Sequence, residues 1–155
     1  MKRSSVARAV LAAGAALGLV AVSPSSAVAA NTNWEYSVPG GNTACGNGFN
    51  PTPDTAIAAC LLYDNNAYPG YARAFAVFFS NAPAGELRML PETTVAIPFG
   101  QGNTCSMEAI SGGGIKYCYG PVFRVNAGCY DIVGAASFVW NTQQTIGSPA
   151  VRICR

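Results

Sequence analysis

Residues 70–81 read GYARAFAVFFSN, and their side chains alternate with a period of two. One parity carries Tyr71, Phe75 and Phe79, while the other carries alanines and Phe78. A period of two is the side-chain repeat of a β-strand. The alanines would also suit a helix, but the aromatic density and the flanking PG and NAP sequences favour a strand. Because both parities are largely apolar, we expect this strand inside a sandwich.

The same pattern recurs along the chain. Residues 130–140, YDIVGAASFVW, are expected to form one strand, with Gly134 at a bulge or a close backbone approach. Further short strands are expected at ELRML, TTVAI, TCSMEAI, IKYCY and AVRIC, separated by Gly-, Pro- and Asn-rich turns. AIAACLLY, residues 56–63, would fit a helix capped by Asp54 or Thr55, but we expect a strand paired with residues 71–79.

Many short strands at regular spacing predict an all-β protein. The expected architecture is a small antiparallel β-sandwich, immunoglobulin-like, stapled by three disulfides. About 125 residues follow the first 30, enough for one domain with its own core. We divide the chain into residues 1–30, an N-terminal arm at 31–44 and a disulfide-stapled domain at 45–155.

Residues 1–30 have the pattern of a secretory signal peptide. Lys2, Arg3 and Arg8 precede an apolar run from Ala9 to Val22, and small residues follow up to Ala30. The run is about 14 residues, shorter than the roughly 20 that a membrane-spanning helix needs. We therefore expect cleavage after Ala29 or Ala30, a secreted extracellular protein, and no stable membrane insertion after cleavage.

The cysteines all lie after this signal. An even number in an exported chain predicts disulfides, and the chain has neither a CxxC pair nor a histidine to suggest zinc. Six cysteines allow fifteen pairings, among which sequence alone does not choose. Neighbour pairing is our prediction: Cys45 with Cys60, Cys105 with Cys118, and Cys129 with Cys154.

Composition argues against several kinds of chemistry. Without its signal the chain has six basic and seven acidic residues, so it lacks the basic face expected of a nucleic-acid partner. The absence of histidine excludes Ser-His and Cys-His nucleophile pairs. Among the acids, Asp131 stands out beside a strand expected to be buried, although backbone bonding explains it more simply. We expect no enzyme activity, no catalytic residue, no metal and no cofactor.

The arm is the candidate for recognition. Trp34 and Tyr36 precede a stretch rich in Gly, Pro and Asn, which is too polar for a core strand. Two alternatives stay open: the arm folds back as the first strand of the sandwich, or it projects and places its aromatics in another protein. On the second alternative Trp34 and Tyr36 are partner-binding residues, since these residue types dominate interface energies.

The segments CLLYDNNAYPGYARAFAVFFSNAPAG, TCSMEAISGGGIKYCYGPVF, GCYDIVGAASFVWN and SPAVRIC resemble those of small secreted, cystine-stapled β proteins of filamentous actinobacteria. Within that group the chain is similar to the small adaptor subunits of umbrella toxin particles. Such an adaptor links a lectin subunit to a repeat-containing toxin stalk in antibacterial competition. The resemblance implies that these secreted proteins are the partners, and that residues 31–43 lie at a subunit contact.

A secreted protease or hydrolase inhibitor is the alternative function. Such inhibitors are small and rigid, and they present a pre-organised loop to the target's cleft. ISGGGIKYC, residues 110–118, would supply that loop, with Lys116 as its contact residue.

Overall fold

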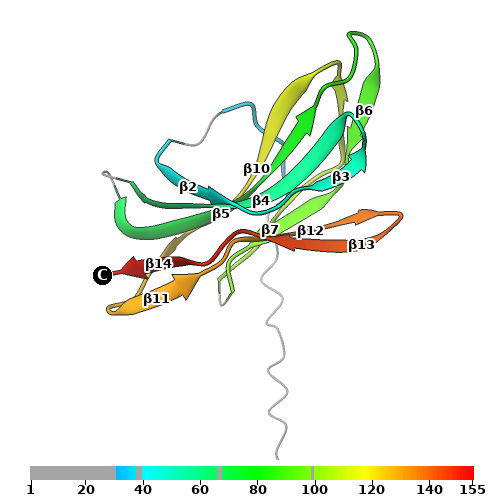
Figure 1. Ribbon diagram of the computed structural model, residues 1–155. Helices are drawn as coiled ribbons and strands as arrows, with labels where there is room; N and C mark the ends of the chain where they lie inside the picture. The colour runs from blue at the N-terminus through cyan, green and yellow to red at the C-terminus, as the bar shows by residue number, and fades with distance from the viewer. Residues whose placement is uncertain (1–30, 38–39, 66–67, 99) are drawn as a thin grey trace, which may run out of the picture.

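The computed structural model describes residues 31–37, 40–65, 68–98 and 100–155. The predicted signal peptide lies outside the described residues. Among the described residues all regular structure is strand, and no helix is long and apolar enough to cross a membrane. Two sheets of five strands each make up the body, and two short ribbons extend from it (Figure 1).

Sheet B is built around a long hairpin. It contains β10 (Gly114–Arg124), β5 (Tyr68–Ser80), β4 (Thr55–Asn65) and β2 (Asn42–Cys45) in that order, and β3 (Phe49–Thr52) also pairs with β4. All its pairings are antiparallel. The pairing of β4 with β5 confirms the strand that we expected at residues 56–63.

Sheet A gathers strands from both ends of the chain. Its order is β1 (Asn31–Thr32), β8 (Asn103–Cys105), β7 (Thr93–Ala96), β12 (Ala135–Trp140) and β13 (Thr142–Gly147). Only the pairing of β1 with β8 is parallel. The ribbons pair β6 (Leu87–Leu90) with β9 (Glu108–Ser111), and β11 (Cys129–Ile132) with β14 (Val151–Cys154).

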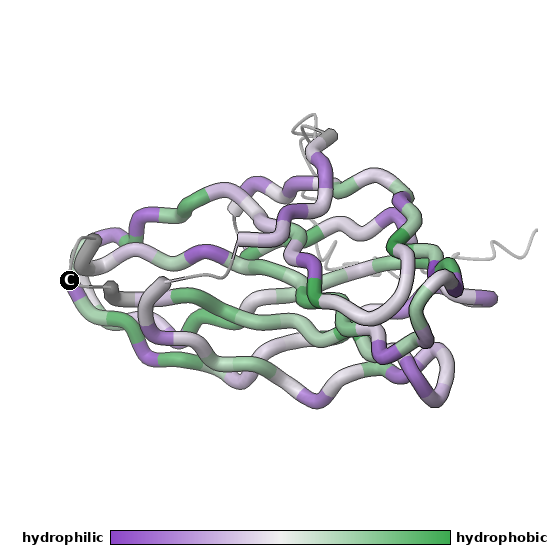
Figure 2. The backbone as a smooth tube through the Cα atoms, turned by 90° about the horizontal axis from the view of Figure 1, so that it is seen from above, coloured by the Kyte–Doolittle hydropathy of each residue, from purple (hydrophilic) through white to green (hydrophobic). Residues whose placement is uncertain are grey.

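The main core lies where the two sheets pack together. Ile57 and Phe78 of sheet B and Val95 and Phe138 of sheet A belong to one cluster of buried residues. Phe75, on the opposite parity of β5, is also buried, in a cluster on the outer face of sheet B. Figure 2 shows hydrophobic residues concentrated along the strands of the body and hydrophilic ones mostly towards the turns. The all-β class and the strand at residues 70–81 are therefore confirmed, whereas immunoglobulin-like connectivity stays a prediction. Of the two faces of this strand, the one that carries Phe78 is buried, while on the other Phe75 is buried and Phe79 is exposed.

The disulfides follow the predicted neighbour pairing. Cys45 bonds to Cys60, Cys105 to Cys118, and Cys129 to Cys154. The first and third each join directly opposed residues of two antiparallel strands, with Cα atoms 4.0 Å and 4.1 Å apart. The bond between Cys105 and Cys118 links β8 of sheet A to β10 of sheet B through the core. Three disulfides are consistent with an extracellular protein.

Some expected strands are divided. Residues 130–140 form two strands, β11 in a ribbon and β12 in sheet A, and the chain changes direction at Val133 and Gly134. A Cβ on Gly134 would lie 2.6 Å from the carbonyl oxygen of Cys60, so this glycine is the predicted close backbone approach. TCSMEAI is divided likewise between β8 and β9. A period of two continues through such a break, so local pattern does not reveal it.

Candidate interaction surface

The N-terminal arm is part of the folded body. β1 pairs with β8 of sheet A, and Glu35 exchanges two backbone hydrogen bonds with Tyr117 of β10 in sheet B, at 2.9 Å and 2.8 Å. The arm therefore joins the two sheets along one side of the sandwich. Of the two alternatives for this segment, the structure favours the first strand over a projecting extension. The predicted division between an arm at 31–44 and a domain beginning at 45 does not match this packing.

Trp34 lies in the main core and is 4% exposed. Its ring meets that of Phe78 edge-on, with centroids 6.3 Å apart. Its indole N–H donates a hydrogen bond to the Ser106 carbonyl oxygen at 3.1 Å. The predicted partner-binding role of Trp34 is corrected here, because a side chain that fills the core is not available to another protein without unfolding part of this one.

Tyr36 has the opposite environment and is 68% exposed. Its ring lies over the ammonium group of Lys116, which is 4.4 Å from the ring centroid. A shallow hollow of about 370 Å³ adjoins this pair. Residues from the arm, the β8–β9 connection and β10 line it: Asn33, Trp34, Tyr36, Ser106, Met107, Glu108 and Lys116. Tyr36 is therefore the arm residue that remains able to contact a partner.

Lys116 is not on a loop. It lies within β10, is 3% exposed, and its ammonium group forms an ion pair with Glu108 of β9. Burial favours the neutral amine, but the bond and charge of Glu108, together with Tyr36, raise the pKa of Lys116 above its ordinary value. The predicted inhibitor contact is wrong, because that role needs a side chain that projects into solvent.

An aromatic cluster occupies the outer face of sheet B beneath the arm. Phe75 of β5 packs against Tyr117 and Tyr119 of β10, with ring centroids 6.2 Å and 5.6 Å away. The Tyr119 hydroxyl donates a hydrogen bond to the Ser37 carbonyl oxygen at 2.6 Å, so the arm is fastened over the cluster. Figure 1 shows the blue N-terminal segment above this face. Burial raises the pKa of Tyr119 to about 12, partly opposed by the nearby charge of Arg73.

A groove of about 420 Å³ lies on the outer face of sheet A, and we call it the methionine groove. Thr94 and Ser137 lie at directly opposed positions on the two strands that cross it. Its remaining lining comes from the end of β6, the β6–β7 connection, the β8–β9 connection and the β12–β13 hairpin: Met89, Leu90, Pro91, Glu92, Met107, Phe138, Val139, Trp140 and Gln143. Met107 also lines the hollow beside Tyr36, so the two depressions adjoin.

Large apolar side chains in this groove are open to solvent. Met107 and Val139 are each 64% exposed, Met89 is 47% exposed, and Leu87 is exposed on the neighbouring ribbon. Among the described residues that line the groove, Glu92 alone carries a charge. An exposed apolar patch with a polar rim is typical of a surface that binds another macromolecule. Methionine suits such a surface because its unbranched chain adapts to different partners.

The described residues offer little for catalysis or metal binding. They contain no group of three or more His, Cys, Asp or Glu side chains placed to hold a metal ion. Asp131, expected beside a buried strand, is exposed in β11, and its carboxylate lies 3.5 Å from the Arg152 guanidinium. The expectation that Asp131 adjoins a buried strand was wrong, because β11 pairs only with β14 outside the sandwich.

Comparison with known proteins finds no matching family model, no matching curated protein and no matching solved structure. The surface itself therefore has to support any functional conclusion. Sequence reasoning missed the methionine groove, since its residues are spread from Met89 to Gln143. The two methionines outside the predicted signal peptide, Met89 and Met107, were the available signal.

Proposed function

We propose that the chain is a secreted, non-enzymatic protein-binding module that acts as an adaptor between other secreted proteins. The observation that carries this proposal is the methionine groove, an exposed apolar depression on the outer face of sheet A. Its partners would be a toxin stalk and a lectin subunit, as for the adaptors that the sequence resembles. Residues 1–30 would direct the chain out of the cell and be removed.

The groove has the chemistry of a protein contact. Met89, Met107 and Val139 expose apolar surface whose transfer from water contributes roughly 25 cal/mol per Å² buried. Glu92 and Gln143 provide polar groups at the margin, where hydrogen bonds select orientation. Tyr36 lies beyond Met107 and extends the same surface towards the arm. Tyrosine is enriched among the residues that dominate binding energy at interfaces.

The alternative of a protease inhibitor has less support. Its contact residue, Lys116, is buried and already paired with Glu108. Releasing its ammonium group would break this ion pair and the contact with the Tyr36 ring. The adaptor proposal requires no such rearrangement, because its apolar residues are already exposed.

The test uses Val139→Asp in the tagged chain without its signal, added to culture fluid of the producing organism. We expect the unmodified chain to retain specific large secreted proteins, identified by mass spectrometry, and Val139→Asp to lose them. A carboxylate in the contact would be desolvated without a partner, which weakens binding by at least about tenfold.

Val122→Asp is the matched control. Val122 is also a valine exposed on a strand, at 59%, but it lies on β10 away from the groove. This variant should retain the same proteins as the unmodified chain. Equal retention by both variants, with both folded by circular dichroism, would contradict the groove as the contact. Retention of no protein by the unmodified chain would contradict the adaptor function itself.

A further inference from the structure

Most sheet edges in this protein are protected against pairing with another strand. At one edge of sheet B, β10 is bridged by Glu35, contains Pro121, and has a register irregularity between Tyr119 and Val122. The Tyr119 carbonyl oxygen also accepts a hydrogen bond from the Asn103 side chain at 2.8 Å. Bridges, prolines and irregularities of this kind prevent strands of different molecules from pairing.

The other edges are short, broken or charged. β2 and β3 divide the second edge of sheet B into two pieces of four residues, and Pro51 lies in β3. β1 at the first edge of sheet A has two residues. The ribbons carry charged side chains, with Arg88 on β6 and Arg152 on β14. Each of these features is a recognised way of blocking edge-to-edge association.

β13 has none of these features. Its six residues, TQQTIG, include no charged residue and no proline, and they pair with β12 over six positions without a register shift. Four of the six are exposed. Within the described part of the chain no strand pairs with the other edge of β13. Gly46 closely approaches only the last residue, Gly147, so the free edge runs from Thr142 to Ile146.

We propose that this edge pairs with the β13 edge of a second copy, antiparallel and about a two-fold axis, so that sheet A continues from one molecule into the other. Outward-facing N–H and C=O groups of an edge strand are matched by those of another edge. Two identical uncharged strands meet without repulsion between like charges. A two-fold axis makes the contact close on itself, which yields a dimer instead of a filament.

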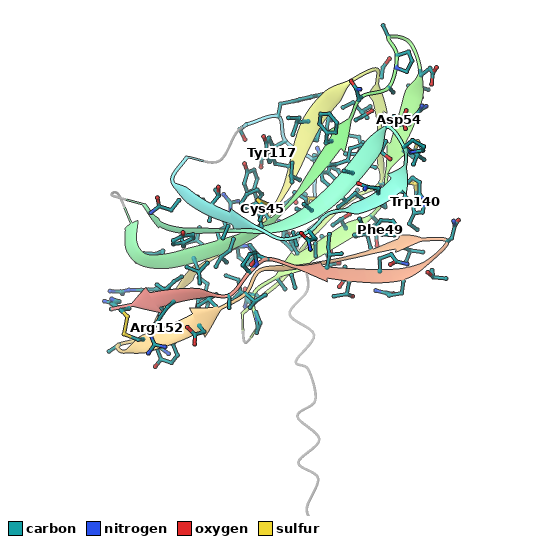
Figure 3. All side chains as sticks on the ribbon, viewed as in Figure 1. Cys45, Phe49, Asp54, Tyr117, Trp140 and Arg152 are labelled. Carbon is teal, nitrogen blue, oxygen red and sulfur yellow. A yellow bond between two sulfur atoms is a disulfide. The ribbon has the colours of Figure 1, made fainter. Side chains whose placement is uncertain are left out.

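Incompletely buried apolar side chains near this edge support the same arrangement. Phe49, Trp140 and Ile146 pack against the main core but are only partly buried. Figure 3 shows Phe49 and Trp140 labelled between β3 of sheet B and the β12–β13 hairpin of sheet A. A second copy at the edge of β13 would cover part of this opening. Trp140 and Gln143 also line the methionine groove, so the two surfaces adjoin, but the pairing of β13 edges does not require the proposed adaptor function.

The size of the contact predicts a weak dimer. Stable interfaces bury about 800 Å² on each partner, more than a single pair of six-residue strands provides. We therefore expect association to become detectable by sedimentation velocity only as the protein concentration rises from micromolar to millimolar. Over the same range the backbone amides of Gln143 to Ile146 should gain protection from hydrogen exchange. A chain that stays monomeric throughout this range would overturn the proposal.

Charge substitutions on β13 test whether this strand forms the dimer contact. Gln143→Lys with Thr145→Lys, and Gln143→Glu with Thr145→Glu, place like charges across the two-fold contact. Each double variant alone should dimerise about tenfold more weakly than the unmodified chain, and an equimolar mixture of the two should regain association. If association recovers when the two variants are mixed, a general loss of folding is excluded as the cause of their weaker dimerisation.

Thr43→Lys is the matched control, since Thr43 is an exposed residue of the edge strand β2 in sheet B. This variant should dimerise like the unmodified chain. Equal weakening by Thr43→Lys, or unchanged dimerisation of the two double variants, would overturn pairing through β13.

Discussion

Lys116 and Glu108 form an ion pair whose two ends lie in different surroundings. The lysine side chain is 4% exposed, whereas that of Glu108 is 35% exposed. Removing the partner of a buried charge is costly, because the remaining charge stays desolvated and unpaired. Removing the buried charge itself has no such penalty. The two halves of the pair should therefore differ in what their loss does to stability.

We expect Glu108→Gln to lower the free energy of unfolding by about 2–3 kcal/mol and Lys116→Met to lower it by about 1 kcal/mol or less. Methionine keeps most of the lysine volume, and what it loses is the ammonium group with its ion pair to Glu108 and its contact with the Tyr36 ring. Urea denaturation of both variants at neutral pH measures the difference. If Lys116→Met lowered the free energy of unfolding more than Glu108→Gln, an unpaired buried charge would not be the main cost of breaking this ion pair.

The structural role of Gly134 was partly predictable from the sequence. Its position in an otherwise apolar stretch predicted a close backbone approach, and the carbonyl oxygen of Cys60 occupies the space that a Cβ would need. The identity of that neighbour was not predictable, since 74 positions separate the two residues in the chain. A glycine indicates that space is short, whereas the fold determines what fills it.

The three disulfides lie in different elements and differ in their exposure to solvent. Cys129 and Cys154 are exposed in a ribbon outside the sandwich, and Cys45 is exposed at an edge strand. Cys105 and Cys118 are both fully buried between the sheets. Thiol–disulfide exchange requires that a thiolate reach a sulfur atom, so the rate of reduction depends on access.

Reduction by dithiothreitol without denaturant should therefore proceed in order. Cys129–Cys154 is expected to open first, Cys45–Cys60 next, and Cys105–Cys118 only when the sheets separate. Alkylation at successive times followed by peptide mass spectrometry measures this order, and near-ultraviolet circular dichroism follows the packing. Alkylation of Cys105 while the near-ultraviolet signal is intact would show that the core is more open than described.

The boundaries of elements were less predictable than their type. β5 and β4 were expected from alternation and apolar composition, and both are present. β13 was not expected, because TQQTIG lacks apolar alternation. A polar strand is recognisable only from its neighbour, here β12, whose backbone groups it pairs.

At the scale of the whole molecule, the N-terminal arm joins the two sheets. Trp34 fills the core between them, and Glu35 continues the backbone pairing of β10. Deleting the arm would therefore destabilise the fold as well as remove any contact with a partner. A binding experiment on a truncated chain has to be accompanied by a measurement of stability.

Trp34→Ala should lower the free energy of unfolding by about 3–5 kcal/mol, as expected for a large aromatic removed from a core. Tyr36→Ala, two residues away and exposed, should change it by less than about 1 kcal/mol. Guanidinium denaturation of both variants measures the difference. Similar stability of the two variants would contradict the burial of Trp34 and would favour the alternative in which the arm projects from the body.

The sequence by itself determined the all-β class and the principal strands, because side chains alternate along a strand whatever the strand packs against. The neighbour pairing of the cysteines was predicted, but the tertiary structure chose it among fifteen possibilities by bringing the two members of each pair together. The tertiary structure alone decided that Trp34 is buried, that Lys116 faces Glu108, and that scattered apolar residues meet in the methionine groove. These outcomes depend on how the sheets pack, because packing brings together residues that are far apart in the sequence and buries one side chain while it exposes another.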